Sequence, residues 1–154
     1  MKKLSFSFFI SIFLLSCQFN SVKAQLLIGK LNNSVPVLTA NKTTLISNFS
    51  KNLLGLSGIN GNFTDVMIVP DGSNYYLVFK GSQFRSSMLL KTVPATDDNS
   101  TTNFYEDGGH VTCTTSDCAS EPTGCVPSPV GLSCTPCANK GKCTKTVSSF
   151  SMLQ

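Results

Sequence analysis

Residues 113–143 read CTTSDCASEPTGCVPSPVGLSCTPCANKGKC and hold six of the seven cysteines of the 154-residue chain. These six are the disulfide candidates, with the spacing C-x4-C-x6-C-x8-C-x2-C-x5-C: Cys113, Cys118, Cys125, Cys134, Cys137 and Cys143. Thr, Ser, Pro and Gly fill most of the other positions, so the stretch has few apolar side chains with which to build a core. An even number of cysteines in such a stretch predicts a cysteine-rich disulfide module over residues 113–146, whose pairing the sequence leaves open.

The same cysteines allow two other kinds of chemistry. Cys134 and Cys137 are spaced like half of a zinc knuckle, and Cys113 with Cys118 would complete a structural zinc knot. The tetrapeptide CTPC at 134–137 also resembles the CxPC motif of thioredoxin-like proteins, in which two thiols exchange disulfides. That motif opens a helix after a strand, whereas this one lies between a proline-rich and a glycine-containing segment. We expect structural disulfides, with a thiol–disulfide redox protein using Cys134 and Cys137 and a zinc knot as alternatives.

The remaining sequence offers no set of residues suited to catalysis. His110 is the only histidine, so a Ser-His-Asp or Cys-His arrangement would have to use it, and nothing in the sequence places it beside a nucleophile. His110 is also conceivable as a metal ligand beside Cys113. We predict no catalytic residue, no cofactor, no metal site and therefore no enzymatic activity.

The first 24 residues have the pattern of an export signal. Lysines precede a 12-residue apolar run, LSFSFFISIFLL at 4–15, which is too short to span a bilayer. Cleavage after residue 24 would release a secreted chain beginning at Gln25. Alternatively, LLSC at 14–17 resembles a bacterial lipobox, so that a lipoprotein signal of residues 1–16 would leave Cys17 lipidated at the cell surface. We predict membrane attachment only if Cys17 is lipidated.

Residues 25–95 carry most of the large apolar side chains and predict a small α+β domain. Leu45, Phe49 and Leu53 recur with the period of a helix. Strand patterns follow at 63–69, 75–80 and 86–93, joined by short turns, and residues 26–31 suit an edge strand. The predicted fold class is α+β, with one helix packed on a three- to four-stranded antiparallel meander, followed by an irregular disulfide-rich C-terminal tail.

Alternation along the predicted strands leaves apolar side chains on both faces of the sheet. Val66, Ile68, Leu77 and Phe79 fall on the face expected to meet the helix. The opposite face would then carry five further apolar residues: Met67, Val69, Tyr76, Val78 and Leu89. So many apolar residues on an outer face predict a partner there, either the Cys-rich tail or another molecule.

Charges divide the chain unevenly. Residues 96–121 contain six acidic residues and no basic one, and 96–112 is interpreted as an acidic linker, with a tail at 147–154 after the module. Removal of residues 1–24 would leave nine basic against eight acidic residues. So balanced a charge argues against a nucleic-acid partner. The sequence thus predicts a small exported, disulfide-stabilised, non-catalytic protein that binds an unknown protein or surface partner.

Overall fold

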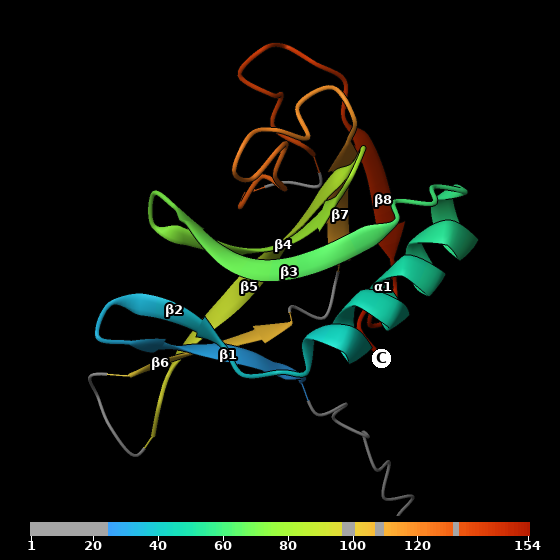
Figure 1. Ribbon diagram of the computed structural model, residues 1–154. Helices are drawn as coiled ribbons and strands as arrows, with labels where there is room; N and C mark the ends of the chain where they lie inside the picture. Colours follow the sequence, from blue (N-terminus) through green and yellow to red (C-terminus); the bar gives the residue numbers. More distant parts are fainter. Residues whose placement is uncertain (1–24, 97–100, 107–109, 131–132) are drawn as a thin grey trace, which may run out of the picture.

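The computed structural model of the protein describes residues 25–96, 101–106, 110–130 and 133–154 (Figure 1). The predicted leader and the lipidation candidate Cys17 lie outside the described residues. Within them, no helix is both long enough and apolar enough to cross a bilayer.

Eight antiparallel strands form one sheet that nearly closes into a barrel, so the predicted fold class is wrong. The strands are β1 (Leu27–Asn32), β2 (Val35–Leu38), β3 (Phe63–Asp71), β4 (Asn74–Gly81), β5 (Arg85–Pro94), β6 (Thr102–Glu106), β7 (His110–Thr115) and β8 (Thr144–Ser148). The described residues contain one helix, α1 (Lys42–Ser57), which lies along β3 at the side of the barrel (Figure 1). The expected meander β3–β4–β5 is present, but it is only part of a larger sheet that the C-terminal residues complete.

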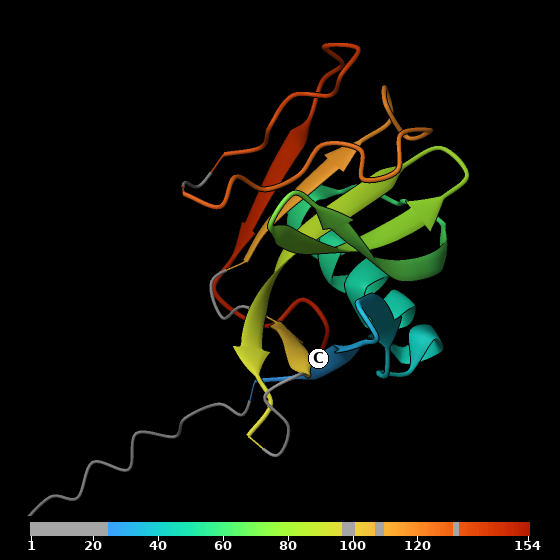
Figure 2. The same ribbon diagram turned by 90° about the vertical axis from the view of Figure 1, so that its left-hand side faces the viewer.

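Strand β5 joins the two parts of this sheet. Residues 85–89 pair with β4 along one edge. Along the other edge, residues 85–88 pair with β7, and residues 90–94 pair with β6. The order of hydrogen-bonded strands is therefore β2-β1-β6-β5-β4-β3. Strand β7 pairs with the first half of β5 outside this order, and β8 pairs with β7 (Figure 2). Part of the expected linker supplies β6, and part of the expected irregular tail supplies β8.

The two ends of the strand order, β2 and β3, contact each other, and beside this contact Gly29 of β1 approaches Ile68 of β3. A Cβ atom on Gly29 would lie 2.6 Å from Cδ1 of Ile68 in β3, so a larger residue would push the strands apart. Glycine permits this close approach because it has no side chain. An added Cβ would also lie 2.3 Å from the Val37 carbonyl oxygen of β2, so Gly29 leaves no room for a side chain.

Helix α1 closes one side of the barrel with the stripe that the sequence predicts. Leu45, Phe49 and Leu53 are all buried. The Asn41 side chain caps the helix by accepting a hydrogen bond from the Thr44 amide at 3.0 Å. Gly58 ends it in the left-handed conformation, with a φ of 72°.

Two residues near the C-terminus, Met152 and Leu153, belong to the core cluster that α1 also lines. Met152 and Leu153 are buried, and Asn48 of α1 donates to the Leu153 carbonyl at 2.9 Å. Glu106, at the end of β6, accepts from the Met152 amide at 2.9 Å and from the Ser151 hydroxyl. A buried carboxylate with these partners fixes the chain end against the sheet. Met152 and Leu153 are therefore part of the barrel core.

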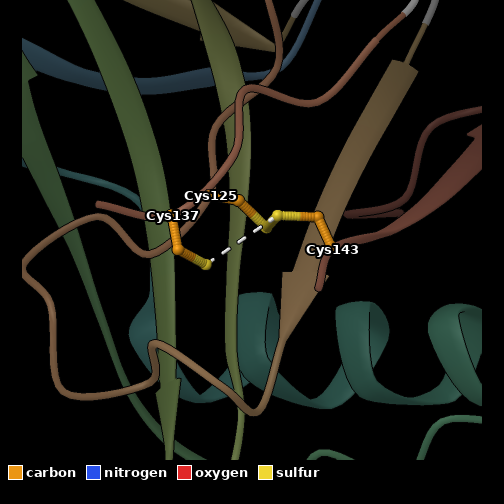
Figure 3. A group of neighbouring side chains, drawn as sticks. All are labelled: Cys125, Cys137 and Cys143. Atoms are coloured by element: carbon orange, nitrogen blue, oxygen red, sulfur yellow. Dashed lines mark hydrogen bonds between the residues drawn. A yellow bond between two sulfur atoms is a disulfide. The ribbon is translucent and has the colours of Figure 1, made fainter. Parts of the chain in front are cut away.

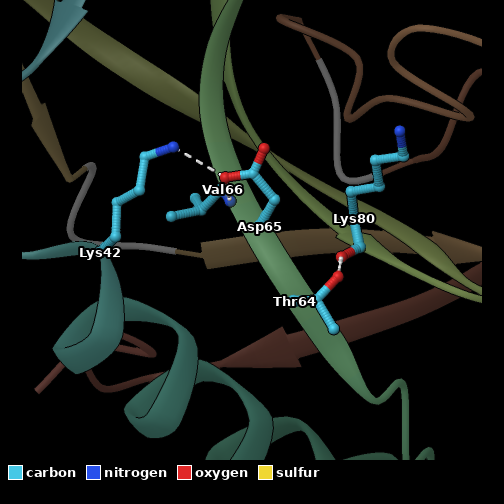
Figure 4. Close-up of polar contacts among 5 residues, drawn as sticks. All are labelled: Lys42, Thr64, Asp65, Val66 and Lys80. Carbon is cyan, nitrogen blue, oxygen red and sulfur yellow. Dashed lines mark hydrogen bonds and ion pairs between the residues drawn. The ribbon is translucent and has the colours of Figure 1, made fainter.

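An ion pair links the start of α1 to β3 (Figure 4). Lys42 Nζ lies 2.7 Å from Oδ1 of Asp65, and the hydrogen bond from Lys42 lowers the pKa of Asp65. The Val66 amide donates to the same carboxylate at 2.8 Å and acts in the same direction, while burial opposes both. The pair stabilises the folded state above the pKa that Asp65 has in the unfolded chain, and this contribution is lost as the pH falls through the lowered, folded-state pKa.

Replacement of Asp65 with asparagine should therefore lower stability by about 0–1 kcal/mol at neutral pH, because exposed ion pairs contribute little. The two side chains are 56 % and 40 % exposed. Urea unfolding of Asp65→Asn and of the parent should differ at pH 7 and converge as the solution is acidified. Lys42→Gln should show the same convergence. A difference that stays constant with pH would contradict the assigned role of the ion pair.

Candidate functional site

Residues 116–143, of which the structure describes 116–130 and 133–143, form a cap over the outer face of β3, β4 and β5, seen as the loops at the top of Figure 1. The cap begins where β7 ends and returns to the sheet at β8. Both ends are thereby fixed to neighbouring strands, which pair from His110 with Ser148 to Thr114 with Thr144. The segment is an anchored loop of the barrel, and it is the candidate functional site of the protein.

Three disulfides hold the cap. Cys113 pairs with Cys134, Cys118 with Cys137 and Cys125 with Cys143, at Cα–Cα distances of 5.7, 6.0 and 6.2 Å. The order is first with fourth, second with fifth and third with sixth, so each bridge closes a loop that overlaps the other two. The bonded residues are 21, 19 and 18 positions apart. In the chain-entropy model, one bridge over a loop of this size contributes about 3 kcal/mol.

The sulfur atoms of neighbouring bridges lie close together beneath the cap (Figure 3). Sγ of Cys137 is 3.9 Å from Sγ of Cys143, and the sulfurs of Cys125, Cys137 and Cys143 all lie within 4.8 Å of one another. A zinc knot would require that these bonds be reduced, because metal ligation needs free thiolates. The side chain of His110 lies outside the described part of the structure.

Cys134 and Cys137 are not bonded to each other. Each pairs with a different partner, Cys134 with Cys113 in β7 and Cys137 with Cys118 in the cap. The disulfide of a thioredoxin-like CxPC motif joins its own two cysteines, so this motif is used differently here. The structure brings all six candidate cysteines together, in a pairing that their spacing did not reveal.

The apolar outer face of the meander is the surface that the cap covers. Val126 packs on the buried Tyr76 and Val78, and the partly buried Val69 and Leu89 surround them. Of the two occupants that the sequence left open for this face, the Cys-rich segment of the same chain covers the part around Tyr76 and Val78, whereas Met67 stays 36 % exposed. Packing on the sheet gives the cap an apolar contact in addition to its disulfides.

Arg85 anchors the cap through backbone groups. Its Nη1 donates to the carbonyls of Glu121 and Pro122, the latter at 2.7 Å, and the side chain is buried. Burial lowers the pKa of Arg85, but an arginine side chain stays charged in proteins. Gly124 lies against it with a φ of 63°, where an added Cβ would be 3.3 Å from Cβ of Arg85. Sequence reasoning missed this role, although Arg85 is the only arginine of the chain.

Hydroxyl groups add further links between sheet and cap. The Ser87 hydroxyl donates to the Thr123 carbonyl, and the Tyr76 hydroxyl donates to the Pro127 carbonyl at 3.4 Å. Burial raises the pKa of Tyr76, and the negative charge of Asp71 raises it further. The neutral phenol is thereby favoured, and it can donate this hydrogen bond.

Two acidic side chains order the cap from within. Asp117 accepts from the Lys142 amide at 2.8 Å, and its carbonyl accepts from the Asn139 side chain at 2.9 Å. Glu121 accepts from the Ala138 amide at 3.4 Å. These contacts tie the start of the cap to its last turn.

Two hollows flank the cap. One, of about 450 Å³, lies between the β3–β4 turn and the cap and is lined by Val69, Pro70, Asp71, Glu121, Pro122, Thr123 and Ala138. The other, of about 400 Å³, is lined by Ser133, Cys134, Pro136, Gly141, Cys143 and Lys145. Neither lining pairs a nucleophile with a histidine base.

Comparisons of the chain with protein-family models, curated proteins and solved structures find no match. The candidate site is therefore defined by its own contacts. Those contacts describe a rigid, disulfide-bonded loop on a barrel.

Proposed function

We propose that this disulfide-stabilised protein is exported and acts as a non-catalytic binding protein outside the cytoplasm, with the cap as a recognition surface. The main support for the proposal is the three disulfides, whose loops overlap and which fix a long surface loop on the sheet. Loops held by a rigid scaffold are common binding elements. A loop already fixed in one conformation loses little entropy on binding.

Export is supported by the disulfides together with the leader pattern. Disulfides form and persist in oxidising compartments and are rare in the cytosol. The apolar run at 4–15 has the length and basic start of an export signal. Release after residue 24 and lipidation at Cys17 both remain part of the proposal, because each places the cap outside the cytoplasm.

The burial of four of the six cysteines supports a structural role over thiol exchange. Cys113 and Cys118 are fully buried, and Cys125 and Cys137 are exposed by 1 % and 3 %, whereas Cys134 and Cys143 are partly buried. Thiol–disulfide exchange needs an accessible sulfur for the incoming thiolate. The CTPC segment therefore presents no self-contained redox pair to a substrate.

The proposal is tested by counting thiols and assaying disulfide reduction on the exported protein. We expect no free thiol without reductant, three bridges by the mass gained on reduction, and no reduction of insulin. The matched variant is Cys113→Ala/Cys134→Ala, which removes one bridge and one member of the CTPC segment. An insulin-reducing activity that this variant abolishes would overturn the non-catalytic assignment, and four or more free thiols would overturn its disulfide basis.

A further inference from the structure

The cap covers only half of the outer surface of the barrel. On β5, Leu89 faces the cap, whereas Lys91 and Val93, which project on the same side, lie beyond it. The uncovered half is formed by β2, β1, β6 and the second half of β5, and we call it the bare face. Its main side chains are Leu27, Lys30, Val35, Val37, Lys91 and Tyr105.

The strand register places these side chains on one side of the sheet. Val37 pairs with Lys30, which pairs with Asn103, which pairs with Val93, so that one row crosses four strands. Leu27, Tyr105 and Lys91 form a second, parallel row. Directly paired residues project on the same side. A bulge between Leu27 and Gly29 shifts the register of β1 by one residue, so Leu27 and Lys30, three positions apart, can share that side and the two rows make one surface.

Three aliphatic side chains of the bare face are open to solvent. Leu27 is 43 % exposed, Val35 60 % and Val37 37 %. The outer face of β4 has a similar character, and there the cap covers it. A contiguous exposed group of aliphatic side chains marks a contact surface.

The charges of the bare face indicate the chemistry of its occupant. Lys30 and Lys91 are exposed, and the paired rows that make up the bare face contain no acidic residue. Two copies meeting through this face would bring like charges together, which disfavours a symmetric dimer. Aliphatic side chains with a tyrosine and lysines suit the interface of an anionic bilayer, where the tails contact lipid and the ammonium groups contact phosphates.

The path of the chain also leads to this face. The described structure begins at Gln25, two residues before Leu27. The 24 preceding residues include the apolar run at 4–15 and the lipidation candidate Cys17. An acyl group on Cys17 would be separated from Gln25 by seven residues, a tether of about 25 Å when extended.

We propose that the bare face rests on an anionic membrane surface, which leaves the cap on a different part of the barrel for its partner. This inference rests on the proposed location outside the cytoplasm and adds the lipid surface as a binding partner. Short aliphatic side chains and two lysines give shallow, peripheral contact. The contact does not require a membrane-spanning segment.

The test uses the protein as exported, with its N-terminus read from the intact mass, in mixed phosphatidylglycerol–phosphatidylcholine bicelles that contain a gadolinium-labelled lipid. We expect the methyl signals of Leu27, Val35 and Val37 to relax about tenfold faster than those of Leu54 and Leu56. Leu54 and Leu56 are matched controls, because they are 49 % and 42 % exposed on α1. This readout reports orientation whether or not an acyl anchor is present.

Charge-reversal variants distinguish binding through the bare face from general electrostatic attraction between the protein and the anionic lipids. Lys30→Glu/Lys91→Glu should abolish the preferential relaxation, whereas Lys51→Glu/Lys140→Glu, with the same change in net charge, should preserve it. Equal relaxation of all these methyl groups, or equal loss in both variants, would overturn the proposal. A lipid-free dimer that Val35→Ser/Val37→Ser dissociates would also overturn it, by assigning the face to a second copy. None of these outcomes changes the thiol count or the insulin assay, so failure here is distinguishable from failure of the proposed function.

Discussion

Replacement of Phe49 with alanine should lower the free energy of unfolding by about 3–5 kcal/mol. Phe49 is fully buried and stacks on Phe79, with ring centroids 3.8 Å apart and an interplanar angle of 5°. Phe63 meets the same ring edge-on at 5.4 Å. Removing the ring leaves a cavity between α1 and the sheet that neighbouring side chains fill only in part. Urea unfolding followed by circular dichroism measures the loss.

Leu54→Ala is the matched control for this prediction. Leu54 lies on the same helix but is 49 % exposed, so its truncation should cost about 1 kcal/mol or less. If Phe49→Ala unfolded at the same urea concentration as the parent, Phe49 would not be at the contact between helix and sheet.

Removal of the Cys118–Cys137 bridge should lower stability by about 2–4 kcal/mol. The double variant Cys118→Ala/Cys137→Ala leaves no unpaired thiol and retains the two other bridges. The loss arises because the unfolded chain gains freedom and because the buried sulfurs no longer fill the interior of the cap. Differential scanning calorimetry without reductant measures the change.

The same variant should loosen the cap while the barrel stays folded. Proteolysis should cut within residues 116–143 faster than in the parent, and the ring contacts of Phe49 should persist. Val130→Ala is the control within the cap, because Val130 is 98 % exposed and its truncation should alter neither stability nor cleavage. A bridge variant as stable and as resistant as the parent would show that this bond does not restrain the cap.

The local elements of residues 25–95 could be predicted because their patterns are strong. The spacing of Leu45, Phe49 and Leu53 indicated the helix, and the alternation around Val66 and Phe79 indicated the meander and its inner face. These signals depend on nearby residues and on apolar periodicity. They carry no information about which other strands continue the sheet.

The C-terminal strands were missed because polar side chains stand at their inward positions. Thr112 and Thr114 of β7 are buried opposite Met88 and Ser86 of β5, and the Ser86 and Thr114 hydroxyls lie 2.5 Å apart. Such hydroxyl-rich stretches resemble loops in a sequence. Strand β6 adds a second difficulty, since its partner β1 lies far away along the chain and leaves no local signal.

In the candidate site, too, the sequence predicted local features and missed the contacts between residues far apart in the chain. Cysteine count and composition predicted disulfides, but the choice of partners follows from how the cap crosses the sheet. The anchoring role of Arg85 also depends on tertiary contact, because its acceptors are the carbonyls of Glu121 and Pro122 in the cap. The apolar outer face gave the one useful long-range signal, and the packing of Val126 accounts for it.

Nuclear Overhauser effects between cap and sheet test the central claim, that the Cys-rich segment is a cap fixed on the outer face of the barrel. The structure predicts cross-peaks from the methyl groups of Val126 to the Tyr76 ring and the Val78 methyl groups. Phe49 and Phe79 provide the internal reference, since their rings stack in the core. Cross-peaks at both places are the predicted result. Reference cross-peaks without any between Val126 and the sheet would contradict it and would make the Cys-rich segment a separate module.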